Sequence, residues 1–202
     1  MLKKVFDEAS LNLREREKAR DEAYSRARRA RMLSKQAILF LHNDDTMRAG
    51  GNIDEASGLL REIKGYSERF TEIGFFEAVT AARQEYAEAC ILRGLNIGEG
   101  FPDPEELGLD YLDYLLGLAD VPGELRRQSL DLLRAGNIAE AEENLVIMDE
   151  IYLNLTGMEE ASLLLKGLRR KLDIMRGVNE RTRAEITSEV SRERLRKSLE
   201  KL

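Results

Sequence analysis

The chain has 202 residues, of which 35% are charged and only 6% aromatic, with three prolines and no tryptophan. This composition favours long amphipathic helices over a β-rich fold, and the length suits one domain of ordinary size. The formal net charge of −6 excludes a uniformly basic polyanion binder, so any nucleic-acid site must be a local basic surface.

Cysteine use and hydropathy indicate the compartment. Cys90 is the single cysteine, which excludes an internal disulfide and suits a reducing environment. The chain does not open on a signal-peptide pattern, and no apolar run reaches the roughly 18 residues that a membrane span needs. We therefore expect a cytoplasmic protein with no membrane segment.

The first predicted element is one long helix over residues 5–41, a stretch without Pro or Gly. At about 100° per residue, one face of this helix gathers basic residues and a tyrosine. These are Arg16, Arg20, Tyr24, Arg28, Arg31 and Lys35. The neighbouring face carries small and apolar residues that predict close helix packing, namely Ala19, Ala23, Ala30, Leu33, Ala37 and Leu41. Taken alone, such a basic face is more often a solvated surface paired with acids of its own helix.

Two glycine-containing segments share a pattern. Residues 47–53 predict a helix end in which Gly supplies the left-handed residue, with helices following over residues 54–70 and 74–95. Residues 134–141 echo residues 48–56, and we expect both to be corners between two helices.

The second half of the chain also predicts helices. A break over residues 94–104 ends at Asp103-Pro104, which predicts the start of a short helix. A longer helix follows over residues 111–133, where Pro122 should kink it or begin a new helix. Further helices are expected over residues 141–155 and 159–198, the last with an apolar stripe. That stripe consists of Leu163, Leu164, Leu168, Leu172 and Met175.

These elements predict an all-α fold of about seven helices, with a long N-terminal helix. We expect residues 1–202 to form one domain, because no flexible linker or shift in composition interrupts the chain. Residues 177–202 are strongly charged and predict either a C-terminal helix or a frayed tail.

Two pairs of carboxylates are candidate metal ligands. Glu85 and Glu88 lie three apart and share a helix face, and Asp120 and Glu124, four apart, would share another if the helix continues through Pro122. Carboxylates from two facing helices can hold Mg²⁺ or Mn²⁺. The spacing is not specific in a chain with 38 acidic residues, and Asp120 could instead cap a helix with its side chain.

Three segments resemble the translin family, and within it the translin-associated factor X branch. Residues 84–89 (Gln-Glu-Tyr-Ala-Glu-Ala) resemble the family's Gln-Glu-Tyr-Val-Glu-Ala. Residues 117–125 (Gly-Leu-Ala-Asp-Val-Pro-Gly-Glu-Leu) resemble that branch's Gly-Val-Ala-Asp-Leu-Thr-Gly-Glu-Leu, with Pro122 where the family often has Thr. Residues 171–176, with 178–180, are similar to the family's Lys-rich C-terminal helix.

The resemblance implies an octameric helical shell that encloses RNA, and for the factor X branch a Mg²⁺-dependent endoribonuclease acting mainly on single-stranded RNA. The family's catalytic and metal-binding acids match Glu85, Glu88, Asp120 and Glu124 in this chain. The ion would be Mg²⁺ or Mn²⁺. In such a shell the basic helix face would bind RNA phosphates, and Tyr24 could stack on a base.

Two other functions stay open from the sequence. One is a shell that binds RNA or single-stranded DNA without cleaving it, as in the translin branch. The other is a helical scaffold, similar to tetratricopeptide proteins, that binds protein helices. We expect a homo-octamer, with a translin-type partner subunit as the alternative.

Overall fold

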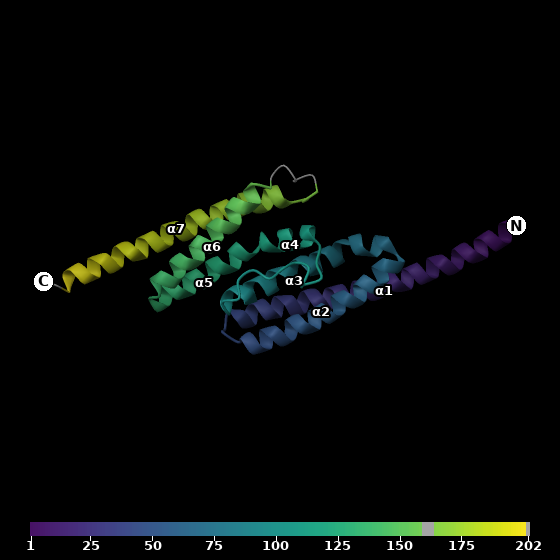
Figure 1. The fold of residues 1–202 in the computed structure, drawn as a ribbon, viewed down its shortest axis with the longest axis horizontal. Helices are drawn as coiled ribbons and strands as arrows, with labels where there is room; N and C mark the ends of the chain where they lie inside the picture. Colours follow the sequence, from purple (N-terminus) through teal and green to yellow (C-terminus); the bar gives the residue numbers. More distant parts are fainter. Residues whose placement is uncertain (159–163, 201–202) are drawn as a thin grey trace. The chain divides into compact units, whose positions relative to one another are not determined.

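The computed structural model describes residues 1–158 and 164–200. The residues it describes form seven α-helices and one 3₁₀ helix, η1, with no strand (Figure 1). The predicted all-α class and the number of helices are therefore confirmed. The chain divides into two compact units, Met1–Tyr114 and Leu115–Leu202. The single domain remains a prediction.

The first unit is built around its long N-terminal helix, α1 (Leu2–Leu41). It packs along α2 (Thr46–Arg69) and α3 (Glu77–Asn96), with η1 (Thr71–Phe75) between these two in sequence. The predicted packing face of α1 is confirmed, because all six of its residues are buried. Ala23, Ala30 and Ala37 are fully buried, and such small side chains let the backbones of two helices approach closely.

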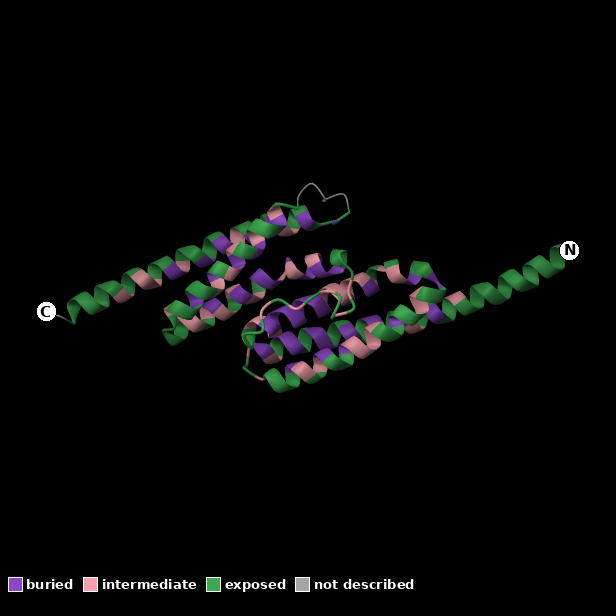
Figure 2. Cartoon of the chain, in the orientation of Figure 1, coloured by how far each residue is buried: buried purple, intermediate pink, exposed green. Residues whose placement is uncertain are grey.

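The first turns of α1 bury no side chain, although Glu15 forms an exposed ion pair with Arg69 of α2 at 2.6 Å. Residues 1–15 are exposed throughout, as the continuous green segment at the N-terminus shows (Figure 2). The helix begins three residues earlier than predicted, at Leu2. Since isolated helices of this length are only marginally stable in water, the buried part of α1 supports the helical state of the exposed part.

The prediction of a corner between two helices at residues 47–53 is wrong. Helix α2 already begins at Thr46, because the Asp45 carboxylate caps it by accepting a hydrogen bond from Arg48 N at 3.1 Å. Gly50 and Gly51 lie inside the helix, where each glycine lowers the stability of the helix by only about 1 kcal/mol relative to alanine. The similar segment at residues 134–141 does form a corner, because Gly136 has φ 85° and ends α5 (Val121–Ala135).

The connection after α3 also differs from prediction. Residues 104–108 form a turn rather than a short helix, and Asp103 Oδ1 accepts a hydrogen bond from Glu105 N at 2.7 Å. The connection folds back onto the last turn of α3. A Cβ at Gly94 would lie 2.3 Å from the Gly100 carbonyl oxygen, so this close approach requires glycine. Helix α4 (Tyr111–Leu118) follows and contains the boundary between the units.

The second unit contains α5, α6 (Ile138–Thr156) and α7 (Leu168–Leu199), which pack on one another. Pro122 stands in the first turn of α5 and begins a helix there, one of its two expected effects. Of the predicted stripe, Leu168, Leu172 and Met175 are buried and Leu164 is exposed, while Leu163 lies outside the described residues. The charged C-terminal segment is helical through Leu199.

Across the described part of the chain, no helix combines the length and the apolar character that crossing a bilayer requires.

The two glycine segments give a matched stability test. Gly51→Ala should stabilise the protein by about 0.5–1 kcal/mol, because Gly51 lies in a helix and the added Cβ would meet no atom within 4 Å beyond its chain neighbours and the helix's own backbone. Gly136→Ala should destabilise it by about 1 kcal/mol, because alanine is strained at φ 85°. Urea unfolding of both variants measures these free energies. Equal changes of the same sign would contradict this assignment of the two segments.

Candidate functional site

The first candidate pair lies on α3, in the most buried part of the first unit. Glu88 is 8% exposed and the side chain of Glu85 is 15% exposed. Their neighbours along the helix include Ala87, Ala89 and Ile91, all fully buried. Burying carboxylates costs several kcal/mol unless positive charge or hydrogen bonds compensate them, so this turn of α3 requires cations nearby.

Those cations come from the predicted basic face of α1. Arg31 Nε lies 3.2 Å and Lys35 Nζ 3.7 Å from the same atom, Glu85 Oε2. The structure thus brings two residues of the predicted RNA-binding set to one residue of the predicted metal-binding set. They are 54 and 50 positions apart in sequence from Glu85, and the close packing of α1 on α3 makes the contact.

The other residues of the basic face have different partners. The Arg16 guanidinium pairs with Glu72 of η1 and lies 5.0 Å from the centre of the Phe70 ring. Arg20 pairs with Asp21 at 2.8 Å, as expected for a solvated surface. The Arg28 guanidinium lies 5.9 Å from the ring centre of Tyr24, which is 51% exposed. The face therefore combines neutralised cations with an exposed cation–aromatic pair.

The second candidate pair lies in the second unit. Asp120 directly precedes α5 at the N-cap position, yet its carboxylate makes no capping hydrogen bond. It instead forms an ion pair with Lys171 Nζ, which also donates a hydrogen bond to the Leu116 carbonyl at 3.1 Å. The alternative in which Asp120 caps the helix with its side chain is therefore wrong. Glu124 stands in the first turn of α5.

Lys171 has no predicted role in the sequence beyond its place in a Lys-containing motif. Its side chain is 23% exposed, in the first turn of α7, and it contacts a candidate metal ligand from 51 residues away. Sequence spacing cannot detect a contact over that distance. The only signal was its position in residues 171–176, one of the segments that carried the resemblance.

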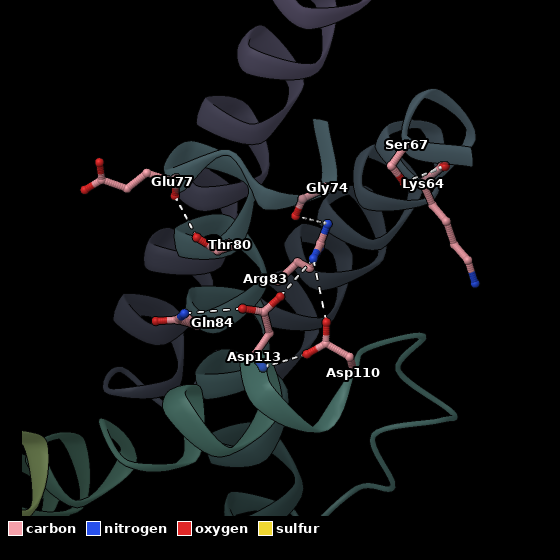
Figure 3. Close-up of polar contacts among 9 residues, drawn as sticks. All are labelled: Lys64, Ser67, Gly74, Glu77, Thr80, Arg83, Gln84, Asp110 and Asp113. Carbon is pink, nitrogen blue, oxygen red and sulfur yellow. Dashed lines mark hydrogen bonds and ion pairs between the residues drawn. The ribbon is translucent and has the colours of Figure 1, made fainter. Parts of the chain in front are cut away.

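A polar network anchors the part of α3 that directly precedes the first acidic pair (Figure 3). Asp113 of α4 is 4% exposed, and its Oδ2 lies 2.9 Å from Arg83 Nη1. Gln84 Nε2 donates to Asp113 Oδ1 at 3.3 Å, and Arg83 Nη2 donates to the Gly74 carbonyl at 3.0 Å. Gln84 thus has a structural contact. The network ties the residues that precede Glu85 to both η1 and α4.

Burial raises the pKa of two side chains near this site, the Asp113 carboxyl and the Cys90 thiol. Burial raises the pKa of Asp113 above its usual range, Asp110 adds to the rise, and Arg83 opposes it. Burial also raises the pKa of the Cys90 thiol to about 12, so the thiol stays protonated at neutral pH.

The donor chemistry fits a hard divalent cation, since carboxylate oxygens are the ligands that Mg²⁺ and Mn²⁺ prefer. Taken singly, neither unit gathers three or more His, Cys, Asp or Glu side chains into a metal-binding group among its described residues. Glu85 and Glu88 belong to the first unit, and Asp120 and Glu124 belong to the second.

Comparison with known proteins identifies related chains. The sequence model of the Translin family matches residues 52–180, a range that contains all four candidate acids. An uncharacterized protein of Methanocaldococcus jannaschii is 32% identical over 152 residues, which cover 74% of this chain and 67% of that protein.

Two solved structures share the fold. The crystal structure of AfC3PO has a TM-score of 0.85 and 33% identity, covering 92% of this chain and 97% of its own. The structure of AfC3PO in complex with duplex RNA has a TM-score of 0.84 and 32% identity, covering 92% of this chain and 96% of its own.

Arg83→Met should destabilise the protein by about 2–4 kcal/mol at pH 7, because it leaves the Asp113 carboxylate buried without its cation. The cost should shrink as the pH falls. Losing Arg83 removes the effect that lowers the pKa of Asp113, so the folded state takes up a proton at higher pH than the unfolded state.

Urea unfolding at pH 7 and at about pH 4.5 measures both effects, since the lower value lies just above the usual Asp pKa. Arg29→Met is the control: its pair with Glu55 is exposed, and its loss should change the unfolding free energy by less than about 1 kcal/mol at either pH. A cost of Arg83→Met that stays constant with pH would contradict the role of Asp113.

Proposed function

Since this chain belongs to the Translin family, we propose that it binds RNA inside an oligomeric shell and cleaves it as a metal-dependent endoribonuclease. The observation that carries the proposal is the contact of Arg31 and Lys35 with Glu85. Cations suited to phosphate and a carboxylate suited to a metal meet at one point in the first unit. A nuclease needs this combination, because the scissile phosphate must reach the metal ligands.

RNA is the proposed ligand class. AfC3PO, which is 32% identical to this chain, has been solved with duplex RNA. Duplexes therefore belong in binding assays beside the single-stranded RNA that the resemblance implies, with single-stranded DNA as a comparison. On α1, Arg16, Arg20, Arg28, Arg31 and Lys35 would neutralise phosphates, and the half-exposed Tyr24 would stack on a base.

The four acids would hold the metal ion. Bound Mg²⁺ or Mn²⁺ would lower the pKa of a water molecule and offset charge on the scissile phosphate. In this proposal Glu85, Glu88 and Asp120 are the ligands, and Glu124 completes the set or orients the attacking water as a base. Lys171 would keep the Asp120 carboxylate in place through its ion pair.

A second candidate is a shell that binds RNA without cleaving it. It is favoured by one observation: Glu85 and Asp120 already have cationic partners within the chain, so neither carboxylate requires a metal for neutralisation. Incubating labelled RNA with Mg²⁺, and again with EDTA, separates the two candidates. The mass of the native particle separates both from a monomeric scaffold, and tests the homo-octamer against a form that needs a translin-type partner subunit.

Glu88→Gln should abolish most metal-dependent cleavage, by about 100-fold or more, because it removes one ligand charge from a buried position. Helix content, measured by circular dichroism, and particle mass should stay unchanged. Cleavage of labelled RNA over time measures the effect. Full activity in this variant, or in the parent protein with EDTA, would show that the nuclease proposal is wrong.

Arg28→Glu combined with Arg31→Glu should weaken RNA binding by about 10-fold or more. The salt dependence should also flatten by about one unit of log Kd per log salt for each lost phosphate contact. Fluorescence anisotropy at several salt concentrations measures both. Lys18→Glu is the control on the same helix, because Lys18 is exposed and lies outside the basic face. An equal loss in the control would contradict a specific RNA-binding face.

A further inference from the structure

Arg31 and Lys35 converge on a single oxygen atom. Arg31 Nε lies 3.2 Å from Glu85 Oε2 and Lys35 Nζ lies 3.7 Å from it. Both cations belong to the proposed RNA-binding face, and the carboxylate belongs to the proposed metal ligands. The same two charges therefore cannot fully neutralise Glu85 and RNA phosphates at the same time.

The partners differ in how freely they can move. The Glu85 side chain is 15% exposed and lies within buried α3, whereas the Arg31 and Lys35 side chains are 49% and 53% exposed. Long, exposed cationic side chains change rotamer easily, while a carboxylate packed in a helix does not. Any exchange of partners at this point is therefore made by the two cations, with Glu85 as the fixed charge.

We propose that the charge on Glu85 regulates RNA affinity: when a divalent cation neutralises this carboxylate, Arg31 and Lys35 are released to bind RNA phosphates. This inference rests on the proposed function. It adds that metal and RNA bind cooperatively, because each removes a competitor for the other, and such coupling is reciprocal. The protein would then bind RNA more tightly when its metal site is filled than when it is empty.

A comparable ion pair on the same helix provides the matched control. Arg16 of α1 pairs with Glu72 of η1, and their side chains are 42% and 44% exposed. Glu72 lies outside the proposed ligand set. Removing its charge frees one cation of the RNA-binding face, but the response to metal remains, because Glu85 is intact.

The test compares Glu85→Gln with Glu72→Gln by fluorescence anisotropy. The probe is a 2′-O-methyl RNA oligonucleotide, checked on a gel to be intact after titration. It is titrated in EDTA and in Mg²⁺ or Mn²⁺ at matched ionic strength. For the parent protein, we expect affinity to rise by about three- to tenfold with metal, as for one or two added phosphate contacts. Glu85→Gln should bind as tightly in EDTA as the parent does with metal, and should not respond to metal.

Glu72→Gln should keep the metal response. Arg31→Ala combined with Lys35→Ala should lose the response while binding weakly in both conditions, so the inference does not depend on a single variant. A Glu85→Gln protein that still responds to metal, or that binds no tighter in EDTA, overturns the inference. A parent protein that binds RNA equally with and without metal also overturns it, but leaves the proposed function standing. Failure to bind RNA in either condition would overturn the proposed function itself.

Discussion

The close packing of α1 on α2 and α3 is the constraint on which the first unit depends. Four alanines on its inner face, Ala23, Ala27, Ala30 and Ala37, are completely buried, and no larger side chain could occupy those positions without separating the helices. Because α1 lies this close, the side chains of Arg31 and Lys35 reach Glu85 from the neighbouring helix. The geometry of the candidate site thus depends on alanines, whose side chains carry no functional group.

In each unit, buried or half-buried carboxylates are neutralised by cations from another helix. In the first unit α1 supplies two cations to Glu85, and in the second α7 supplies Lys171 to Asp120. The network around Asp113 follows the same principle with Arg83. In each case the cation comes from an element distant in sequence. Folding must bring the elements together before the acids are stabilised, so these charges favour the native arrangement over local alternatives.

Periodicity in the sequence predicted the elements well where one pattern ran without interruption. The inner face of α1 followed from spacing alone, and the translin resemblance predicted the family. The glycines of α2 misled the prediction, because Gly50 and Gly51 read as a helix end while a single upstream cap, Asp45, already starts the helix. Contacts such as that of Lys171 with Asp120 lay beyond prediction, since they depend on how α7 packs rather than on any local pattern.

Cys90 gives this protein a built-in reporter. It lies two residues beyond Glu88 on α3, is 7% exposed, and its thiol stays protonated at neutral pH. A protonated, buried thiol reacts with a soluble disulfide reagent only after the surrounding helix opens. Because the chain has no other cysteine, the rate of thiol modification reads out local opening of α3 directly, without any introduced label. The stability of the helix that carries the first acidic pair can therefore be followed in the native protein.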